Sequence, residues 1–322
     1  MRSVARAFAL AFVVLVACLT APPAVAATCG FDAGTATVTV QVGDGESSLL
    51  ARSGDAITLD GAPCDTATVS NTDAIVVNAT GTPASISIDL GGGDFAPGLS
   101  AESDGGSSEI EFTINLPAGT PTLGVIGGEG DDTVVVEAGA INLNAAEPVE
   151  DADVLINGQA AIVLEGNGGS DLLSGGEGDD RIGGGPGNDV LEGGPGTDTV
   201  VFGPVDAGVQ VDLRDGTAQG EGDDSLLGFE NVMGTRHADT LQGDQGSNKL
   251  AGGAGRDALF ADDGADVLRG GPGNDELTGE RGHDGLIGGS GRDQLDGGIG
   301  EDVCKGGPDP DSFVFCENIA LG

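Results

Sequence analysis

The sequence predicts an all-β protein that stacks short repeats into an elongated solenoid. Three observations predict this fold class. Two blocks of the chain, 166–201 and 234–314, repeat every nine residues. Elsewhere, apolar residues alternate with polar ones in short runs rich in Thr, Val and Ile, which is typical of strands, and helical patterns are nearly absent. Aromatic residues make up only 3% of the chain, so stacking of repeats must supply much of the burial.

The first 26 residues have the order of a secretory signal peptide. Arg2 and Arg6 precede the apolar run Ala7–Leu19, and a small-residue site ends at Ala26. We expect cleavage after Ala26 and export of residues 27–322 by general secretion. In the alternative, Cys18 ends a lipobox-like sequence and is acylated as in bacterial lipoproteins. No later run reaches eighteen apolar residues, so we expect no transmembrane segment.

The next region, 27–126, is predicted to be β-rich. Alternating apolar residues occur at Val38–Val42, Ile86–Leu90 and Ile110–Leu116, with Gly, Asp and Asn between the runs. The sequence leaves open whether this region is an N-terminal cap of the solenoid or a small separate β domain.

Thirteen nonapeptides follow in two blocks without a slip inside either block. The first block spans 127–201, with clear repeats at 166–201, and the second spans 234–314. Position eight of every repeat is apolar, from Leu173 to Phe313. Position six is aspartate in all repeats but one, where Asn248 replaces it. The candidate metal ligands are therefore Asp171, Asp180, Asp189, Asp198, Asp239, Asp257, Asp266, Asp275, Asp284, Asp293, Asp302 and Asp311.

The pattern indicates a hard cation bound many times. Glycine fills position one in twelve of the thirteen repeats and position four in eleven, and it allows carbonyl oxygens to crowd around an ion. Calcium prefers six to eight carboxylate and carbonyl oxygens. Zinc would require clusters of Cys or His, whereas His237 and His283 are the only histidines and both are expected to be exposed turn residues.

These repeats resemble the RTX, or haemolysin-type, calcium-binding nonapeptide GGxGxDxUx, in which U is a large apolar residue. The resemblance implies a parallel β-roll. Six residues of each repeat would form a turn and three a short strand, and two nonapeptides would make one coil. It also implies several Ca²⁺ ions, bound between turns on the same side of successive coils.

Aspartates eighteen residues apart should then face each other. We expect the best pairs at Asp171/Asp189, Asp180/Asp198, Asp257/Asp275, Asp266/Asp284, Asp275/Asp293 and Asp284/Asp302. Weaker pairs are expected where His237 or Asp309 replaces the position-four glycine and where Asn248 lacks a charge. An isolated match at 127–135 contains Asp132, which has no neighbour in phase. The alternative for these side chains is a solvated Asx turn.

Three segments lack the nine-residue period. Residues 136–165 are interpreted as solenoid whose cation sites have decayed, 202–233 as a spacer that continues the sheet without binding metal, and 315–322 as a C-terminal tail. Removal of the signal peptide leaves four cysteines, and an even number in an exported chain favours disulfides. We expect the disulfides Cys29–Cys64 and Cys304–Cys316. In the alternative, Cys304 is an unpaired core residue at position eight.

The charge and motifs limit the function classes. A net charge of −41 argues against nucleic acid and anionic membranes as partners. The chain has neither the HExxH of a metalloprotease nor the GxSxG of a lipase, so we expect no enzyme. The sequence favours a secreted calcium-binding protein that folds as calcium binds and has a structural or surface-associated role. The alternatives are an adhesive module for a cell-envelope or extracellular ligand, carried on a calcium-stiffened stalk, and a polysaccharide-acting enzyme.

Overall fold

The computed structural model describes residues 27–43, 46–72, 74–79, 85–89, 111–115, 122–127, 133–137, 140–142, 154–157, 161–203 and 205–320. Every regular element in these residues is a β-strand, which confirms the all-β prediction. Nothing in the described chain forms a helix with the length and hydropathy needed to span a bilayer. The predicted signal peptide, Cys18 and Asp132 lie outside the described residues.

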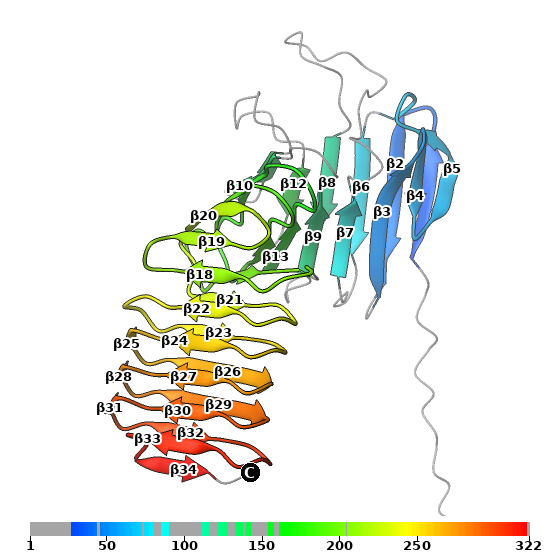
Figure 1. The fold of residues 1–322 in the computed structure, drawn as a ribbon. Helices are drawn as coiled ribbons and strands as arrows, with labels where there is room; N and C mark the ends of the chain where they lie inside the picture. The colour runs from blue at the N-terminus through cyan, green and yellow to red at the C-terminus, as the bar shows by residue number, and fades with distance from the viewer. Residues whose placement is uncertain are drawn as a thin grey trace, which may run out of the picture.

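Most strands belong to two long sheets (Figure 1). Within the described residues sheet A has 17 strands, in the order β1 (Thr28–Asp32), β2 (Thr37–Val42), β6 (Ala74–Ala79), β8 (Glu111–Asn115), β12 (Val154–Asn157), β11 (Ala140–Asn142), β10 (Thr133–Glu137), β14 (Leu172–Ser174), β16 (Val190–Glu192), β20 (Asp223–Leu227), β19 (Thr217–Gln219), β18 (Gln210–Asp212), β22 (Thr240–Gln242), β24 (Ala258–Phe260), β27 (Glu276–Thr278), β30 (Gln294–Asp296) and β33 (Ser312–Val314).

Sheet B has 14 strands in the described residues, in the order β5 (Ala62–Thr68), β4 (Ala56–Leu59), β3 (Ser47–Ser53), β7 (Ser85–Asp89), β9 (Thr122–Ile126), β13 (Ala161–Glu165), β15 (Arg181–Gly183), β17 (Thr199–Val201), β21 (Asn231–Met233), β23 (Lys249–Ala251), β26 (Val267–Pro272), β29 (Gly285–Ser290), β32 (Val303–Lys305) and β34 (Asn318–Ala320). A third, small sheet joins turns of the second block through β25 (Asp263–Gly264), β28 (Arg281–Gly282) and β31 (Ile299–Gly300).

Within the repeat blocks the strands alternate between the two sheets and pair in parallel with a shift of eighteen residues. Leu241 of β22 pairs with Leu259 of β24, and Leu250 of β23 pairs with Leu268 of β26. Two nonapeptides therefore make one coil, which confirms the predicted parallel β-roll. Position-eight side chains face inward and are almost fully buried up to Cys304, because alternate residues of a strand point to opposite faces.

The N-terminal strands belong to the same two sheets as the repeats. Sheet A runs from β6 through β8 to β12, and sheet B from β7 through β9 to β13, all in parallel register. One hydrophobic core extends from Val38 to Cys304. The antiparallel strands β1, β4 and β5 close the N-terminal end of the stack.

Sheet A contains two places where the chain order reverses along the stack. The strands there lie in the spatial orders β12–β11–β10 and β20–β19–β18, and β11 and β19 are antiparallel to both neighbours. Sheet B passes the same levels without extra strands, from β9 to β13 and from β17 through β21 to β23. The spacer thus continues the sheet. Figure 1 shows the stack changing direction in the region of these two insertions.

The structure confirms both predicted disulfides. Cys29 and Cys64 join at the N-terminal end with a Cα–Cα distance of 5.2 Å, and Cys304 and Cys316 join in the last coils with a Cα–Cα distance of 5.9 Å. Cys304 is also fully buried at position eight, so it is both a disulfide cysteine and a core residue.

Candidate metal sites

The turns of the repeat blocks form two rows, one before the strands of each sheet. Eleven of the twelve predicted aspartates are at most 2% exposed, and Asp311 in the last repeat is half-buried. Row A contains Asp171, Asp189, Asp239, Asp257, Asp275, Asp293 and Asp311, and row B contains Asp180, Asp198, Asp266, Asp284 and Asp302. Such burial argues against fully solvated Asx turns.

One carboxylate oxygen of each aspartate is used by the coil that precedes it. The backbone N–H of Asp257 donates to Oδ1 of Asp275 at 3.0 Å, and the N–H of Asp284 donates to Oδ1 of Asp302 at 2.9 Å. The same bond joins every predicted pair, including those expected to be weaker. Within each block both rows are therefore ladders in which position six of one coil binds position six of the next.

The second oxygen, Oδ2, is buried without a hydrogen-bond partner in most of these residues, namely Asp180, Asp189, Asp198, Asp257, Asp266, Asp275, Asp284, Asp293 and Asp302. Except in the repeat of Asp266, it faces the position-one glycine of its own repeat. A Cβ on Gly279 would lie 2.6 Å from Oδ2 of Asp284 and 2.6 Å from the carbonyl oxygen of Gly297, which is position one of the next coil. Glycine thus leaves a small space, here called the cradle, bordered by a carboxylate and a carbonyl.

These cradles fit a hard cation. An orphaned, buried carboxylate oxygen needs a positive partner, and carbonyl oxygens are ligands that calcium accepts. In the described residues no three Cys, His, Asp or Glu side chains converge as a soft-metal site would require. Asp284 and the carbonyl of Gly297 would hold such an ion in row B, and Asp180 with the carbonyl of Gly193 would do the same in the first block.

Burial makes the metal-free carboxylates hard to ionise. Loss of solvent raises the pKa of Asp257 to about 6, although the hydrogen bond from the backbone of Asp239 lowers it, and the charges of Asp239 and Asp275 raise it further. Burial likewise raises the pKa of Asp180, Asp198 and Asp266 to about 6. A bound cation would reverse this penalty, because it favours the charged form.

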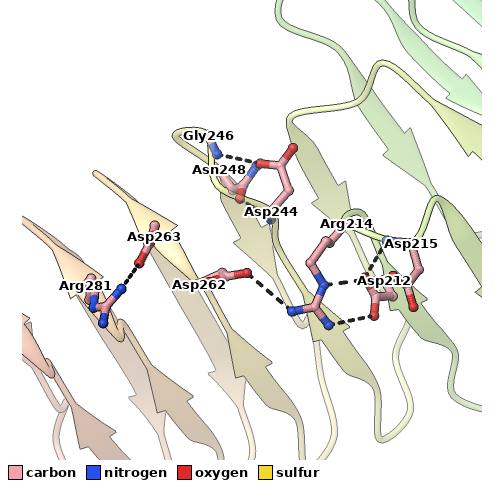
Figure 2. A network of polar contacts seen from close by, with 9 residues as sticks. All are labelled: Asp212, Arg214, Asp215, Asp244, Gly246, Asn248, Asp262, Asp263 and Arg281. Atoms are coloured by element: carbon pink, nitrogen blue, oxygen red, sulfur yellow. Dashed lines mark hydrogen bonds and ion pairs between the residues drawn. The ribbon is translucent and has the colours of Figure 1, made fainter.

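Two predicted positions differ from the rest in their contacts. Thr235 fills position two and donates from its backbone N to Oδ2 of Asp239 at 2.7 Å and from its hydroxyl to Oδ1 at 2.9 Å. Asp239 therefore has no orphaned oxygen. Asn248, which Figure 2 draws beside Asp244, is also satisfied. Its Oδ1 accepts from Asp244 N at 2.8 Å, and its Nδ2 donates to the Glu230 carbonyl at 2.9 Å.

The cradle of Asp266 differs for another reason. Ala261, fully buried, replaces the glycine at position one of that repeat. A side chain therefore stands at the position where glycine leaves the cradle open in the other repeats. The pair Asp266/Asp284 was expected among the best from its charges, but we now expect a weaker cation site there.

Three acidic residues off the nine-residue period extend the ladders. Asp189 N donates to Asp224 Oδ1 at 3.1 Å, Asp198 N to Glu230 Oε2 at 2.8 Å and Asp302 N to Glu317 Oε2 at 3.0 Å. Sequence reasoning missed all three. Only Asp224 has a local signal, because QGEGDDSLL around it matches the repeat out of phase.

The outer surface of the turns carries ion pairs rather than further cradles. Arg214, after β18, lies 3.6 Å from Asp262 of a row B turn and 3.8 Å from Asp212, as Figure 2 shows. His283 is exposed and its Nδ1 accepts from Glu301 N at 3.0 Å, and His237 is half-buried. Exposed pairs of this kind contribute little stability, so they tie the surface together only weakly.

Comparison with known protein families agrees with this arrangement. The family model described as RTX calcium-binding nonapeptide repeat (4 copies) matches residues 125–140 and 165–200 and, in overlapping copies, 233–268, 253–286, 260–295, 269–304 and 286–313. No curated protein matches the chain. The two repeat blocks of this chain therefore belong to the RTX calcium-binding nonapeptide repeat family.

Proposed function

We propose that this is an exported, non-catalytic protein that binds many calcium ions along its two turn rows and has a structural or surface-associated role. The observation that carries the proposal is the set of buried, unpartnered Oδ2 atoms in carbonyl-lined cradles. A dissociation constant of about 10⁻⁴ M, within the range of extracellular modules, corresponds to roughly 5.5 kcal/mol per ion at the standard state.

Calcium binding and folding of the repeats form one event in this proposal. Each coil buries one apolar residue per repeat and places a carboxylate against the carboxylate of the next coil. Two bare carboxylates about 5 Å apart repel by roughly 3 kcal/mol at an effective dielectric of 20. Cations would replace this repulsion with attraction, so the metal-free coils should lose their strands.

Calorimetric titration of the purified chain with calcium, together with far-ultraviolet circular dichroism, tests the proposal. We expect uptake of several ions per chain, with strand signal that is present in calcium and lost in chelator. Magnesium at the same concentration serves as the control, because it demands a smaller octahedral site and gives up its waters reluctantly. No calcium uptake at millimolar concentration, with the same strand spectrum in chelator, would reject the proposal.

The continuity of the sheets supports a structural role over a separate ligand-binding head. Strands β6, β8 and β12 pair in one parallel run, so the N-terminal coils share the stack that carries the repeats. An envelope pull-down with the full chain tests the adhesive alternative. An activity screen against uronate polymers tests the absence of catalysis.

A further inference from the structure

The spacer contains a turn that stacks on the first repeat block as the next repeat would. Residues 219–227 read QGEGDDSLL, which has glycine at positions two and four, aspartate at position six and leucine at position eight. Asp224 stands 26 residues after Asp198, one short of three nine-residue steps, so it falls out of phase. The segment also lies between the ranges matched by the family model, 165–200 and 233–268.

The hydrogen bonds on the two sides of Asp189 are the same. Inside the block, Asp171 N donates to Asp189 Oδ1 at 2.9 Å, and at the spacer Asp189 N donates to Asp224 Oδ1 at 3.1 Å. The next residue repeats the match, because Val190 N donates to the carbonyl of Asp171 and Ser225 N to the carbonyl of Asp189, both at 2.8 Å. Asp224 therefore occupies the ladder position of a repeat aspartate.

The turn preceding Asp224 also packs like a repeat turn. Gly187 N donates to the carbonyl of Glu221 at 3.2 Å, as Gly169 N does to the carbonyl of Pro186 at 3.1 Å. A Cβ on Gly222 would collide with the carbonyl of Gly187, which itself could not carry a Cβ for the same reason. Side chains are thus excluded at position four on both levels, and the turns stack directly.

The turn also has the left-handed backbone and the inward apolar residue of a repeat. Gly220, at position two, has φ +133°, in the region that favours glycine. Leu226 pairs with Leu191 and is only 7% exposed. Residues 221–227 therefore reproduce the later part of the turn and the strand of a nonapeptide, whereas Gln219 ends β19 and pairs antiparallel with Asp223 of β20.

A separate observation points to a ligand between these two turns. Asp189 is 2% exposed, and its Oδ2, which faces Gly184, has no hydrogen-bond partner. Asp224 is 5% exposed, and Glu221 brings a third carboxylate to the same level, with Oε1 held by Gly203 N at 3.0 Å. The buried, unpartnered Oδ2 of Asp189, beside the stacked turn that carries Asp224, calls for a cation.

We infer that residues 221–227 extend the first block as a partial calcium-binding repeat and that Asp189 and Asp224 hold an ion between the first block and the spacer. This inference rests on the proposed function. Gln219 departs from the repeat, because it pairs antiparallel with Asp223 and its side-chain Nε2 donates to Asp223 Oδ1 at 3.0 Å. The inferred site therefore depends on Asp189, Asp224 and the turn at 221–224.

Hydrogen–deuterium exchange of the full chain during calcium titration tests the inference. The variant Asp224→Asn keeps an Oδ1 acceptor for Asp189 N and removes the charge, whereas Asp223→Asn makes the same change at the exposed neighbour. We expect the calcium concentration that half-protects residues 184–192 to rise roughly tenfold in Asp224→Asn and to stay unchanged in Asp223→Asn. Asp224→Glu should return it toward the wild-type value, since Glu230 fills the equivalent place beside Asp198.

Protection of residues 270–278 in the second block separates the two hypotheses. If calcium protects that block in every variant but residues 184–192 respond equally in Asp224→Asn and Asp223→Asn, the spacer repeat is wrong and the proposed function stands. If calcium protects neither block of the wild-type chain, the proposed function itself fails.

Discussion

Oδ1 of Asp302 accepts the backbone N–H of Asp284, eighteen residues earlier, at 2.9 Å. One oxygen of each carboxylate thus fastens two coils, while the other is left for a cation in the cradle of its own repeat. Mutations at the aspartate and at the cradle should therefore have different consequences.

Asp275→Ala should affect two coil contacts at once. Oδ1 of Asp275 accepts from Asp257 N and its Oδ2 is left for a cation, so the loss of the carboxylate leaves a buried donor unsatisfied and removes a cation ligand, while the backbone hydrogen bond from residue 275 to Asp293 remains. We expect the free energy of unfolding in excess calcium to fall by about 1.5–3 kcal/mol. Chemical denaturation measures this change. Asp223→Ala, at an exposed residue off the ladder, is the control, and equal losses in both variants would contradict the assignment.

Gly279→Ala should close one cradle and leave the aspartate in place. Its Cβ would lie 2.6 Å from both Asp284 Oδ2 and the Gly297 carbonyl, so the two oxygens could not converge on an ion. We expect one calcium fewer per chain by native mass spectrometry. Gly285→Ala is the matched control in the same repeat, since the nearest atom to its Cβ would be 3.8 Å away. A full complement of calcium in Gly279→Ala would show that the cradle is not the site.

Ala261→Gly should open the cradle of Asp266 as glycine does in the other repeats. Calcium affinity at Asp266 should rise, because the space beside Oδ2 becomes like that of the other repeats. Glycine also loses more backbone freedom on folding than alanine, by about 0.5–1 kcal/mol, so the metal-free chain should become less stable. Calorimetry should therefore show tighter calcium binding, whereas thermal unfolding of metal-stripped protein at pH 4.5, where protonated carboxylates favour folding, should show a lower midpoint. Tighter binding together with a higher midpoint would count against this account.

Acid should partly replace calcium. Burial raises the pKa of Asp180, Asp198, Asp224, Asp257 and Asp266 to about 6, above their ordinary value of 3.8. Between those pH values the folded chain binds more protons than the unfolded chain, so the stability of the metal-free protein falls as pH rises from about 4 to about 6. Circular dichroism of metal-stripped protein should therefore show more strand signal at pH 4.5 than at pH 7, where the metal-free coils lose their strands. Calcium affinity should fall as the pH is lowered over the same range. If the strand signal of the metal-free protein does not change with pH, the carboxylates are not buried.

The Cys304–Cys316 disulfide should hold the last coils together. It closes a loop with a sequence separation of 12 and joins the core position of β32 to the segment before β34, whose side chains are exposed. Cys316→Ser should cost about 3 kcal/mol locally and speed hydrogen exchange in residues 303–320. Removing the distant Cys29–Cys64 bond should leave those residues unchanged. The same exchange in both variants would show that the bond does not cap the stack.

The sequence was sufficient for the period, the parallel coils and the twelve ladder aspartates, because one repeat imposes the same pairing at every level. It was insufficient where a contact depends on three-dimensional stacking. Glu230 and Glu317 reach their ladder places through turns of other lengths, and Thr235 satisfies Asp239 through a local bond that a search for charges does not reveal. The N-terminal strands join the same two sheets as the repeats through pairing between segments that have no regular period. The sequence alone therefore did not reveal this pairing.

The unequal insertions in the two sheets determine the shape of the molecule. Each insertion adds two strands to sheet A and none to sheet B, and at about 4.8 Å per strand this lengthens one side of the stack by roughly 10 Å. The added strands act as a wedge, and they lie on the outer side of the corner visible in Figure 1. Because the wedge is itself hydrogen-bonded sheet, the angle between the two arms is set by its width rather than by a flexible linker. Removing β18 and β19 should reduce the bend and leave the contribution of the first insertion, around β11.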